Sequence, residues 1–269
     1  MNEYYYQLIV TPDDRPELFA EILLDMVQNA IEEKEGSLIV RNSEPLDDIA
    51  WAIEKFGEKI GIGVSTRQTK ERNEDWIDKY KSSVKPISVG NFYVRPQWEN
   101  PKENTIDIII NPALAFGSGH HETTYSCLQM INDYVKKDDT LLDVGCGSGI
   151  LSIAAAKLGA RVDICDTDAV AVESAQENFT RNEIDFAECW VGSVQDASRT
   201  YDVVVANIIA DVLVMIHKDL KNRVKVGGIL ILSGIIDKYL DKVKEKFQDF
   251  ELIQNLQNKE WHTLILKRI

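Results

Sequence analysis

Three glycines at alternate positions, Gly145, Gly147 and Gly149, follow an acid at the end of a short apolar run. Glycine has no Cβ and tolerates positive φ, so this backbone can turn sharply and lie close to a ligand at the start of a helix. A dinucleotide site needs its third glycine three positions after the second, and Ile150 stands there. The spacing therefore favours a loop that binds S-adenosylmethionine over one that binds NAD. The acid, Asp143, belongs to the same motif.

A second acid follows the first of these glycines by about twenty residues, at the end of the run Ala160–Asp166. A carboxylate at this spacing can accept hydrogen bonds from both ribose hydroxyls of a nucleoside. Asp166 is the preferred ligand and Asp168 is the fallback. Because aspartate is also a favoured N-cap residue, these acids could instead cap the helix expected from Ala169 onward. Both roles can hold together, with Asp168 as the cap and Asp166 as the ligand.

A loop that leads into a helix covers Asn111 to Thr124. The N–H groups at the start of that helix could dock a carboxylate. The adjacent residues His120 and His121 raise the hypothesis of a metal site. However, neighbouring helix residues point apart, and no Cys or His partner stands at ligand spacing. No metal is expected.

The run Tyr201–Asn207 is an apolar strand that ends in a carboxamide. An asparagine side chain offers an acceptor oxygen and a donor NH₂, so Asn207 can hold an incoming neutral amine. The same residue could equally cap the helix that follows. The strand alone leaves both interpretations open. Asp211, one turn into that helix, is expected to be solvated.

Strands and helices alternate regularly from residue 120 onward, which predicts a mostly parallel, doubly wound sheet. Strands are expected at 140–144, 161–166, 186–191, 201–206 and 229–234, and helices at 122–135, 149–158, 169–181, 208–224 and 237–247. Two strand-like runs, 88–95 and 105–110, come before them, and a closing antiparallel hairpin is expected over 251–267. Ligands of such sheets bind beyond the carboxyl ends of the strands, where the glycine loop and Asp166 fall.

The first seventy residues predict a separate small α/β domain. Its expected strands are 4–10, 37–41 and 59–67, and its expected helices are 17–32 and 47–56. No catalytic set of residues occurs there, so its role must be binding or architecture. Apolar residues at helical spacing from Trp76 to Val84 predict a linker helix. We therefore expect a first domain over 1–70, a linker helix over 71–86 and a catalytic domain over 87–269.

The charge and cysteine content narrow the possible partners and compartment. The 269 residues carry 30 basic and 44 acidic side chains, a net charge of −14, which disfavours tight binding to naked nucleic acid. Residues 1–70 hold fourteen acids and seven bases, so this acidic part could attract a lysine-rich protein, although a merely solvated surface is the commoner explanation. There is no CxxC pair, secretory signal or run of eighteen apolar residues. A reduced, cytoplasmic protein that contacts no membrane is expected.

Three motifs together resemble the PrmA family, which methylates ribosomal protein L11. Phe116–Thr124 resembles the family's FGTGxHxTT signature, Asp143–Gly149 its DxGxGxG loop, and Ala206–Ala210 its ANILA segment. Upstream, Glu74–Trp98 is similar to the family's linker, with its DW, lysine-proline and PxW elements. The resemblance is continuous from about residue 73 to the C-terminus. The first seventy residues match only in architecture.

The resemblance implies an α/β fold: a class I S-adenosylmethionine-dependent methyltransferase, Rossmann-like and doubly wound, with a small ferredoxin-like N-terminal domain that recognises the substrate. It implies methyl transfer to the N-terminal α-amine and to lysine ε-amines of ribosomal protein L11. The same fold could act on another protein lysine, on RNA or on a small molecule. The acidic charge and the absence of an NPPY motif at Asn207–Ala210 count against nucleic acid.

The resemblance also implies a set of site residues. They are Gly145 and Gly147 around the methionine part of the cofactor, Asp143 in the same loop, Asp166 at the ribose, Phe116, Gly117 and Thr124 in the loop over the cofactor, and Asn207 facing the transferring methyl as the catalytic residue. The family pattern usually opens DPGxAFGTG, whereas this chain has Asn111, Ala113 and Ser118. Ser118 keeps the hydroxyl, and the other two changes affect the detail of the loop. No dedicated catalytic base is expected, although His121 is the one histidine singled out by the signature.

Overall fold

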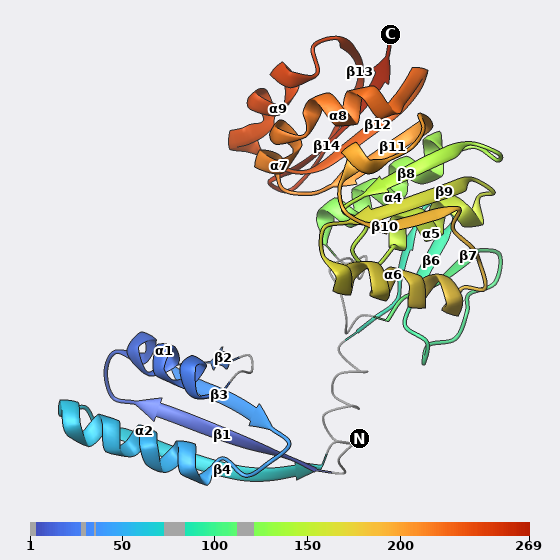
Figure 1. Ribbon diagram of the computed structural model, residues 1–269. Coiled ribbons are helices and arrows are strands. Elements are labelled where there is room, and N and C mark those ends of the chain that lie inside the picture. Colours follow the sequence, from blue (N-terminus) through green and yellow to red (C-terminus); the bar gives the residue numbers. More distant parts are fainter. Residues whose placement is uncertain (1–3, 28–30, 35, 73–83, 112–120) are drawn as a thin grey trace. The chain divides into compact units, whose positions relative to one another are not determined.

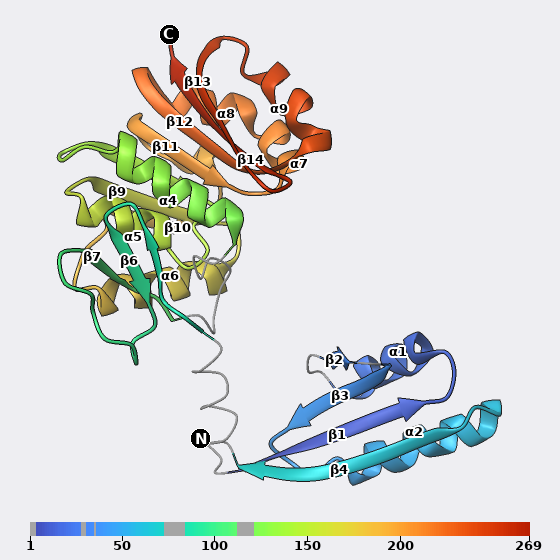
Figure 2. The same cartoon turned by 180° about the vertical axis from the view of Figure 1, so that it is seen from behind.

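The computed structural model describes residues 4–27, 31–34, 36–72, 84–111 and 121–269 (Figures 1 and 2). The chain divides into two compact units, Met1–Ser83 and Val84–Ile269. Among the described residues, no helix is long and apolar enough to cross a membrane.

The N-terminal unit is a four-stranded antiparallel sheet with two helices. Its elements are β1 (Tyr4–Pro12), α1 (Pro16–Met26), β2 (Ile31–Lys34), β3 (Ser37–Asn42), α2 (Asp47–Ile60) and β4 (Val64–Arg72). The strand order is β2-β3-β1-β4, which is the ferredoxin-like topology expected for this part of the chain. Leu8 and Val10 of β1 share one buried core with Phe19 of α1 and Ile53 of α2. The alternation of strand side chains thus directs one face of the sheet to the helices.

Several bounds in this unit differ from the predicted ones. The helix expected over 17–32 ends at Met26, and Ile31 instead begins the unpredicted strand β2, where it pairs with Val40. Ile31 continues the apolar spacing of the helix, so periodicity alone misassigned it. The strand expected over 59–67 is β4, which starts later because α2 continues to Ile60 and ends at Gly61 with φ 74°.

The linker helix expected over 71–86 falls mainly outside the described residues. Its first two residues, Glu71 and Arg72, belong to strand β4. The small sheet therefore continues two residues past the boundary expected at residue 70.

The second unit is built on a seven-stranded sheet. Its strands are β8 (Thr140–Val144), β9 (Arg161–Asp166), β10 (Glu188–Val191), β11 (Tyr201–Asn207), β12 (Val224–Ile236), β13 (Phe250–Asn258) and β14 (Trp261–Arg268). Their order is β10-β9-β8-β11-β12-β14-β13, and β14 runs antiparallel to both of its neighbours. The closing hairpin is confirmed (Figure 2). The strand order reverses between β8 and β11, which is where sheets of this kind bind ligands.

Helices cover both faces of this sheet, so the doubly wound prediction is confirmed. They are α4 (Glu122–Tyr134), α5 (Ile150–Lys157), α6 (Ala169–Arg181), α7 (Ala210–Met215), α8 (His217–Arg223) and α9 (Leu240–Lys246), with 3₁₀ turns at Val194–Asp196 and Asp237–Tyr239. Leu141 packs in the core that includes α4, α5 and α6, whereas Leu142 packs in the core that includes α7, α8 and α9. Neighbouring strand residues thus face opposite helical layers.

Two predicted elements are divided in the structure. The helix expected over 208–224 consists of α7 and α8, which meet at Ile216. The strand expected over 88–95 turns at Gly90, φ 55°, into β5 (Ile87–Val89) and β6 (Phe92–Arg95). These strands and β7 (Ile106–Ile109) form a separate three-stranded sheet.

Candidate active site

A cavity of about 510 Å³ lies at the carboxyl ends of the central strands. Among the residues singled out in the sequence, Gly145, Gly147, Asp166 and Asn207 line it together. Three different strands, β8, β9 and β11, end at these positions. The switch point of the sheet therefore brings together residues that lie up to about sixty positions apart in the chain.

The glycine loop needs glycine for both its conformation and its packing. Gly145, Gly147 and Gly149 have φ values of 73°, 53° and 76°. A Cβ on Gly145 would clash with Ile208 Cγ2. The positive φ values, which glycine adopts at the least cost, form the sharp turn that leads into α5 at Ile150. A side chain at Gly145 would displace a residue of the cavity wall.

Asp166 is held by two backbone N–H groups. Gly147 N donates to Oδ2 at 3.0 Å, and Asp168 N donates to Oδ1 at 3.0 Å. The side chain of Asp168 accepts from Val170 N at 2.9 Å and caps α6. The capping role proposed for Asp168 is therefore confirmed. Asp166 is fixed at the cavity wall, and its role as a ribose ligand stays a prediction.

Asp143 is fully buried and does not line the cavity. Its Oδ2 accepts from Ser152 N at 3.2 Å and from Ser152 Oγ at 2.9 Å, which fixes the first turn of α5 to β8. Its Oδ1 is buried and has no hydrogen-bond partner among the described residues. Burial raises the pKa of Asp143 to about 7, the bonds from Ser152 act to lower it, and the charge of Asp166 raises it further.

Asn207 is the last residue of β11, and its side chain does not cap a helix. α7 begins at Ala210, and its N-cap is Ile209. The capping interpretation is therefore wrong. Instead, Asn207 Nδ2 donates a long hydrogen bond, 3.4 Å, to Thr124 Oγ1. Thr124 is buried and does not line the cavity. It therefore orients the carboxamide from the protein interior, on the side away from the cavity.

His121 and Trp261 complete another wall of the cavity. His121 is the N-cap of α4, and its Nδ1 accepts from Thr123 N at 3.3 Å. Its ring lies edge-on to that of Trp261, with centroids 5.1 Å apart. An ion pair between Lys259 and Glu122 joins the β13–β14 turn to the start of α4.

Trp261 and several apolar residues of the β11–α7 region are among the cavity residues that sequence reasoning did not assign to the site. Ile208, Ile209, Val212 and Ile216 come from that region. Trp261 begins β14 opposite Ile236 at the end of β12. The first residue of an antiparallel strand lies at the same edge as the last residue of its neighbour. An aromatic residue at the start of the predicted last strand was therefore the available signal.

Three predicted residues cannot be placed relative to the cavity and stay predictions. Phe116, Gly117 and His120 lie outside the described residues. No group of three or more His, Cys, Asp or Glu side chains that could hold a metal ion occurs in the described part of the chain.

Comparisons with known proteins agree with the motifs. The family model for ribosomal protein L11 methyltransferase (PrmA) matches residues 19–269. The ribosomal protein L11 methyltransferase of a Nitratiruptor species is 52% identical, over 99% of this chain and 97% of that protein. The one of Campylobacter fetus subsp. fetus is 48% identical, over 99% and 98%. The crystal structure of ribosomal protein L11 methylase from Lactobacillus delbrueckii subsp. bulgaricus, 31% identical, has a TM-score of 0.64 and covers 68% of this chain and 98% of its own. The resemblance is confirmed, and the chain belongs to the PrmA family of methyltransferases.

Proposed function

We propose that this protein transfers methyl groups from S-adenosylmethionine to amino groups of ribosomal protein L11, namely the N-terminal α-amine and lysine ε-amines. The observation that carries the proposal is the meeting of Gly145, Gly147, Asp166 and Asn207 at one cavity. The names of the relatives support the substrate. The cavity volume lies within the range of about 300–1,000 Å³ that is usual for small-molecule sites.

The residues present fit the cofactor. Both oxygens of Asp166 keep lone pairs beyond their bonds to Gly147 N and Asp168 N, and these can accept from ribose hydroxyls. Gly145 and Gly147 leave room for the methionine part. Asp143 supports the loop through Ser152 rather than reaching the cavity. When bound, S-adenosylmethionine supplies a methyl group on a cationic sulfonium, which is a good leaving group.

Asn207 would align the amine. Its NH₂ is engaged by Thr124, and its carbonyl oxygen accepts no hydrogen bond from the described residues, so it can accept from an amine N–H. An accepted N–H leaves the nitrogen lone pair to point elsewhere, toward the methyl group. In-line displacement needs donor and acceptor aligned within about 3–3.5 Å. Positioning by one carboxamide is therefore the main contribution expected from the protein.

The amine must also lose a proton, and we propose that no dedicated base is essential. An apolar cavity beside a cationic sulfonium lowers the pKa of a substrate amine by desolvation and by like-charge repulsion. His121 lines the cavity, but its Nδ1 already accepts from Thr123 N. Replacing His121 with Asn, another good N-cap residue, should keep turnover. Loss of turnover with intact cofactor binding would assign the base role to His121.

The rim of the cavity suits a protein substrate. Ile209 is 67% exposed and Met215 is 73% exposed, and they flank Val212 and Ile216 of the cavity wall. Residues 209, 212, 215 and 216 share one helix face by their spacing. Large exposed apolar side chains grouped at a site are typical of a surface that a protein partner covers. The substrate segment that carries the amine would cover this face.

We further propose that residues 1–70 recognise the substrate, as a separate unit with no catalytic set of its own. The acids of this region outnumber its bases by fourteen to seven, which favours a basic partner. A chain that begins at Val84, the first residue of the second compact unit, should bind S-adenosylmethionine as the full chain does and should not methylate L11. Methylation of L11 by that truncated chain would contradict the recognition role.

Mass spectrometry tests the function directly. Purified L11 is incubated with the full chain and isotope-labelled S-adenosylmethionine, and labelled methyl groups are mapped to individual amines. Labelling of the α-amine and of lysines is expected. The Asn207→Ala variant should bind the cofactor and lose most of the labelling. Labelled RNA or labelled small molecules, with L11 unlabelled, would overturn the proposal in favour of another substrate on the same fold.

A further inference from the structure

A buried asparagine of α6, outside the cavity, joins two segments that the cofactor site depends on. Asn178 is 0% exposed. Its Oδ1 accepts from Asn111 N at 3.1 Å, and its Nδ2 donates to the carbonyl oxygen of Ser148 at 2.9 Å. Ser148 stands between two glycines of the glycine loop, and Asn111 opens the PrmA signature segment. One side-chain amide thus connects the start of that segment to the glycine loop.

The orientation of this amide follows from its neighbours. Arg181 Nη1 also donates to Asn178 Oδ1, at 3.3 Å. Two donors therefore face the oxygen and one carbonyl faces the NH₂. Turning the amide over would place its NH₂ against two donors, which is unfavourable in a buried site. The donor to Ser148 is consequently fixed.

α6 also reaches the glycine loop at the next residue. A Cβ on Gly149 would lie 3.1 Å from Ala175 Cβ and 3.4 Å from a ring carbon of Phe179. The loop and the helix are therefore in close contact, and the hydrogen bond from Asn178 fixes the peptide group between Ser148 and Gly149. Gly147 N in turn donates to Asp166. A shift at the carbonyl of Ser148 would be transmitted to that bond.

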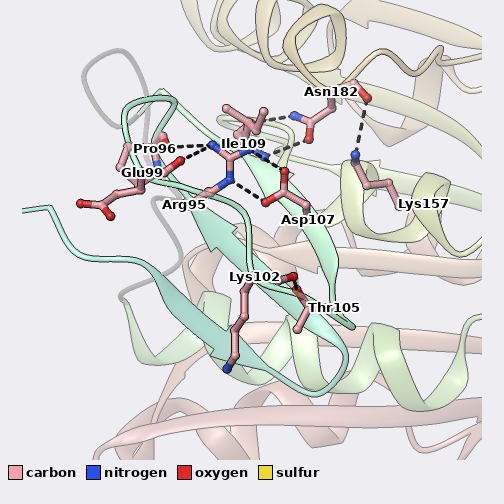
Figure 3. Close-up of polar contacts among 9 residues, drawn as sticks. All are labelled: Arg95, Pro96, Glu99, Lys102, Thr105, Asp107, Ile109, Lys157 and Asn182. Atoms are coloured by element: carbon pink, nitrogen blue, oxygen red, sulfur yellow. Dashed lines mark hydrogen bonds and ion pairs between the residues drawn. The ribbon is translucent and has the colours of Figure 1, made fainter.

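A second asparagine, Asn182 at the C-cap of α6, provides a natural comparison (Figure 3). Asn182 Oδ1 accepts from Ile109 N at 2.9 Å, and its Nδ2 donates to Ile109 O at 2.7 Å, as a neighbouring strand would. β7 is also held by the two hydrogen bonds between Arg95 and Asp107, each 2.7 Å. These contacts anchor β7 without touching the glycine loop. Asn178 is thus not needed to hold β7 in place.

We propose that Asn178 is a positioning residue of the cofactor site, which sets the glycine loop relative to the start of the signature segment at Asn111. The inference depends on the proposed function, because it assumes that S-adenosylmethionine lies against the glycine loop. Asn178 does not line the cavity, so its effect on binding must pass through the Ser148 carbonyl.

A matched pair of variants of the full chain, Asn178→Asp and Asn182→Asp, tests this proposal. Asn178→Asp replaces the donor to the Ser148 carbonyl by an oxygen that repels it, and Asn182→Asp does the same at the backbone carbonyls of Ile109 and Asn178. Both variants should have a lower midpoint of thermal unfolding than the unaltered protein. The Kd for S-adenosylmethionine, from titration calorimetry, should rise about tenfold in Asn178→Asp and stay within about twofold in Asn182→Asp. Equal Kd values in the two variants, whether raised or unchanged, would reduce Asn178 to a structural role and overturn the proposal.

A milder variant covers the case in which Asn178→Asp does not fold. Arg181→Met removes the donor that orients the amide, together with a partly exposed ion pair between Arg181 and Glu177. Its Kd for S-adenosylmethionine should rise about threefold with little change in the unfolding midpoint. An unchanged Kd in Arg181→Met would count against the proposal by itself. If the unaltered chain binds no S-adenosylmethionine, the proposed function fails instead, so the two failures are distinguishable.

Discussion

The carboxylates at the two ends of the central sheet differ in whether a cationic side chain pairs with them. Toward the amino ends of the strands, buried Asp163 accepts from Arg199 Nε at 2.8 Å and from the hydroxyl of Tyr201 at 2.8 Å. Asp202 forms an ion pair with Lys225 at 2.8 Å. Each of these carboxylates therefore has its own cation, which offsets the cost of removing the charge from water.

Toward the carboxyl ends, the carboxylates have no such partner. Asp143 and Asp166 accept hydrogen bonds from backbone N–H groups and from a hydroxyl, and no ion pair in the described part of the chain involves either of them. Asp143 is buried away from the cavity and supports the glycine loop, so of the two only Asp166, at the cavity wall, offers negative potential to a ligand. S-adenosylmethionine, with its sulfonium and ammonium groups, has the matching charge. We therefore expect the amino end to use its carboxylates for stability and the carboxyl end to use Asp166 for binding.

The largest expected effect tests the amino end. Arg199→Met leaves Asp163 buried without its cation, which should lower the free energy of unfolding by about 3 kcal/mol. The Kd for S-adenosylmethionine should not change, because Arg199 does not line the cavity. Urea denaturation and titration calorimetry measure the two quantities. Weaker cofactor binding in a folded Arg199→Met protein would break the division between the two ends.

The next effect tests the carboxyl end. Asp166→Ala removes the carboxylate offered to the ribose and the acceptor for Gly147 N, so the Kd for S-adenosylmethionine should rise about 100-fold, or about 2.7 kcal/mol. Asp168→Asn is the matched control, because asparagine also caps helices well. It should leave the Kd unchanged. A similar loss of binding in both variants would show that the loop after β9, rather than the carboxylate, is responsible.

Most of the carboxyl end could be predicted because its residues stand at the ends of recognisable strands. Asp166 and Asn207 each close an apolar run, and the parallel topology brings such ends together. The glycines could be predicted because three of them at alternate positions mark a backbone that turns sharply, and all three have positive φ in the structure. These signals are local in sequence, and only their meeting at one edge depends on the fold.

The residues that escaped prediction act over long separations or lack a local signal. The two segments that Asn178 joins, at Ser148 and Asn111, are 30 and 67 positions away, so nothing near it in sequence marks this role. Strand β2 has a single apolar residue, Ile31, and exists because β3 provides an edge to pair with. The ion pair between Asp163 and Arg199 at the amino end could not be predicted either, because the two residues are 36 positions apart.

A smaller effect concerns the pH dependence of stability. The pKa of Asp143 is raised by burial to about 7, so the folded state keeps a proton that the unfolded state releases above about pH 4. Stability should therefore fall as the pH rises through this window, by about 2 kcal/mol between pH 5 and pH 7. Asp143→Asn, which stays neutral and can keep the bonds from Ser152, should lack this slope. Parallel slopes for the two proteins in urea denaturation would show that Asp143 is ionised throughout.

The smallest expected effect is the contribution to stability of the half-exposed ion pair between Asp202 and Lys225, at the amino end of the sheet. Burial acts to raise the pKa of Asp202, but the hydrogen bonds from Lys225 and Thr140 and the charge of Lys225 outweigh it and hold the pKa below its usual value. The pair therefore stabilises the fold above the unfolded pKa and stops doing so as the pH falls through the lower folded value. Lys225→Met should cost about 0.5 kcal/mol at pH 7, because water screens the pair and Thr140 still donates to Asp202. Urea denaturation at pH 7 with 0.1 M and 1 M salt checks this, since the difference from the unaltered protein should shrink as salt screens the pair. If Lys225→Met lowered the free energy of unfolding as much as Arg199→Met does, the charge of Asp202 would be as poorly solvated as that of Asp163. The exposure of a carboxylate at this end would then not predict how much its ion pair contributes to stability.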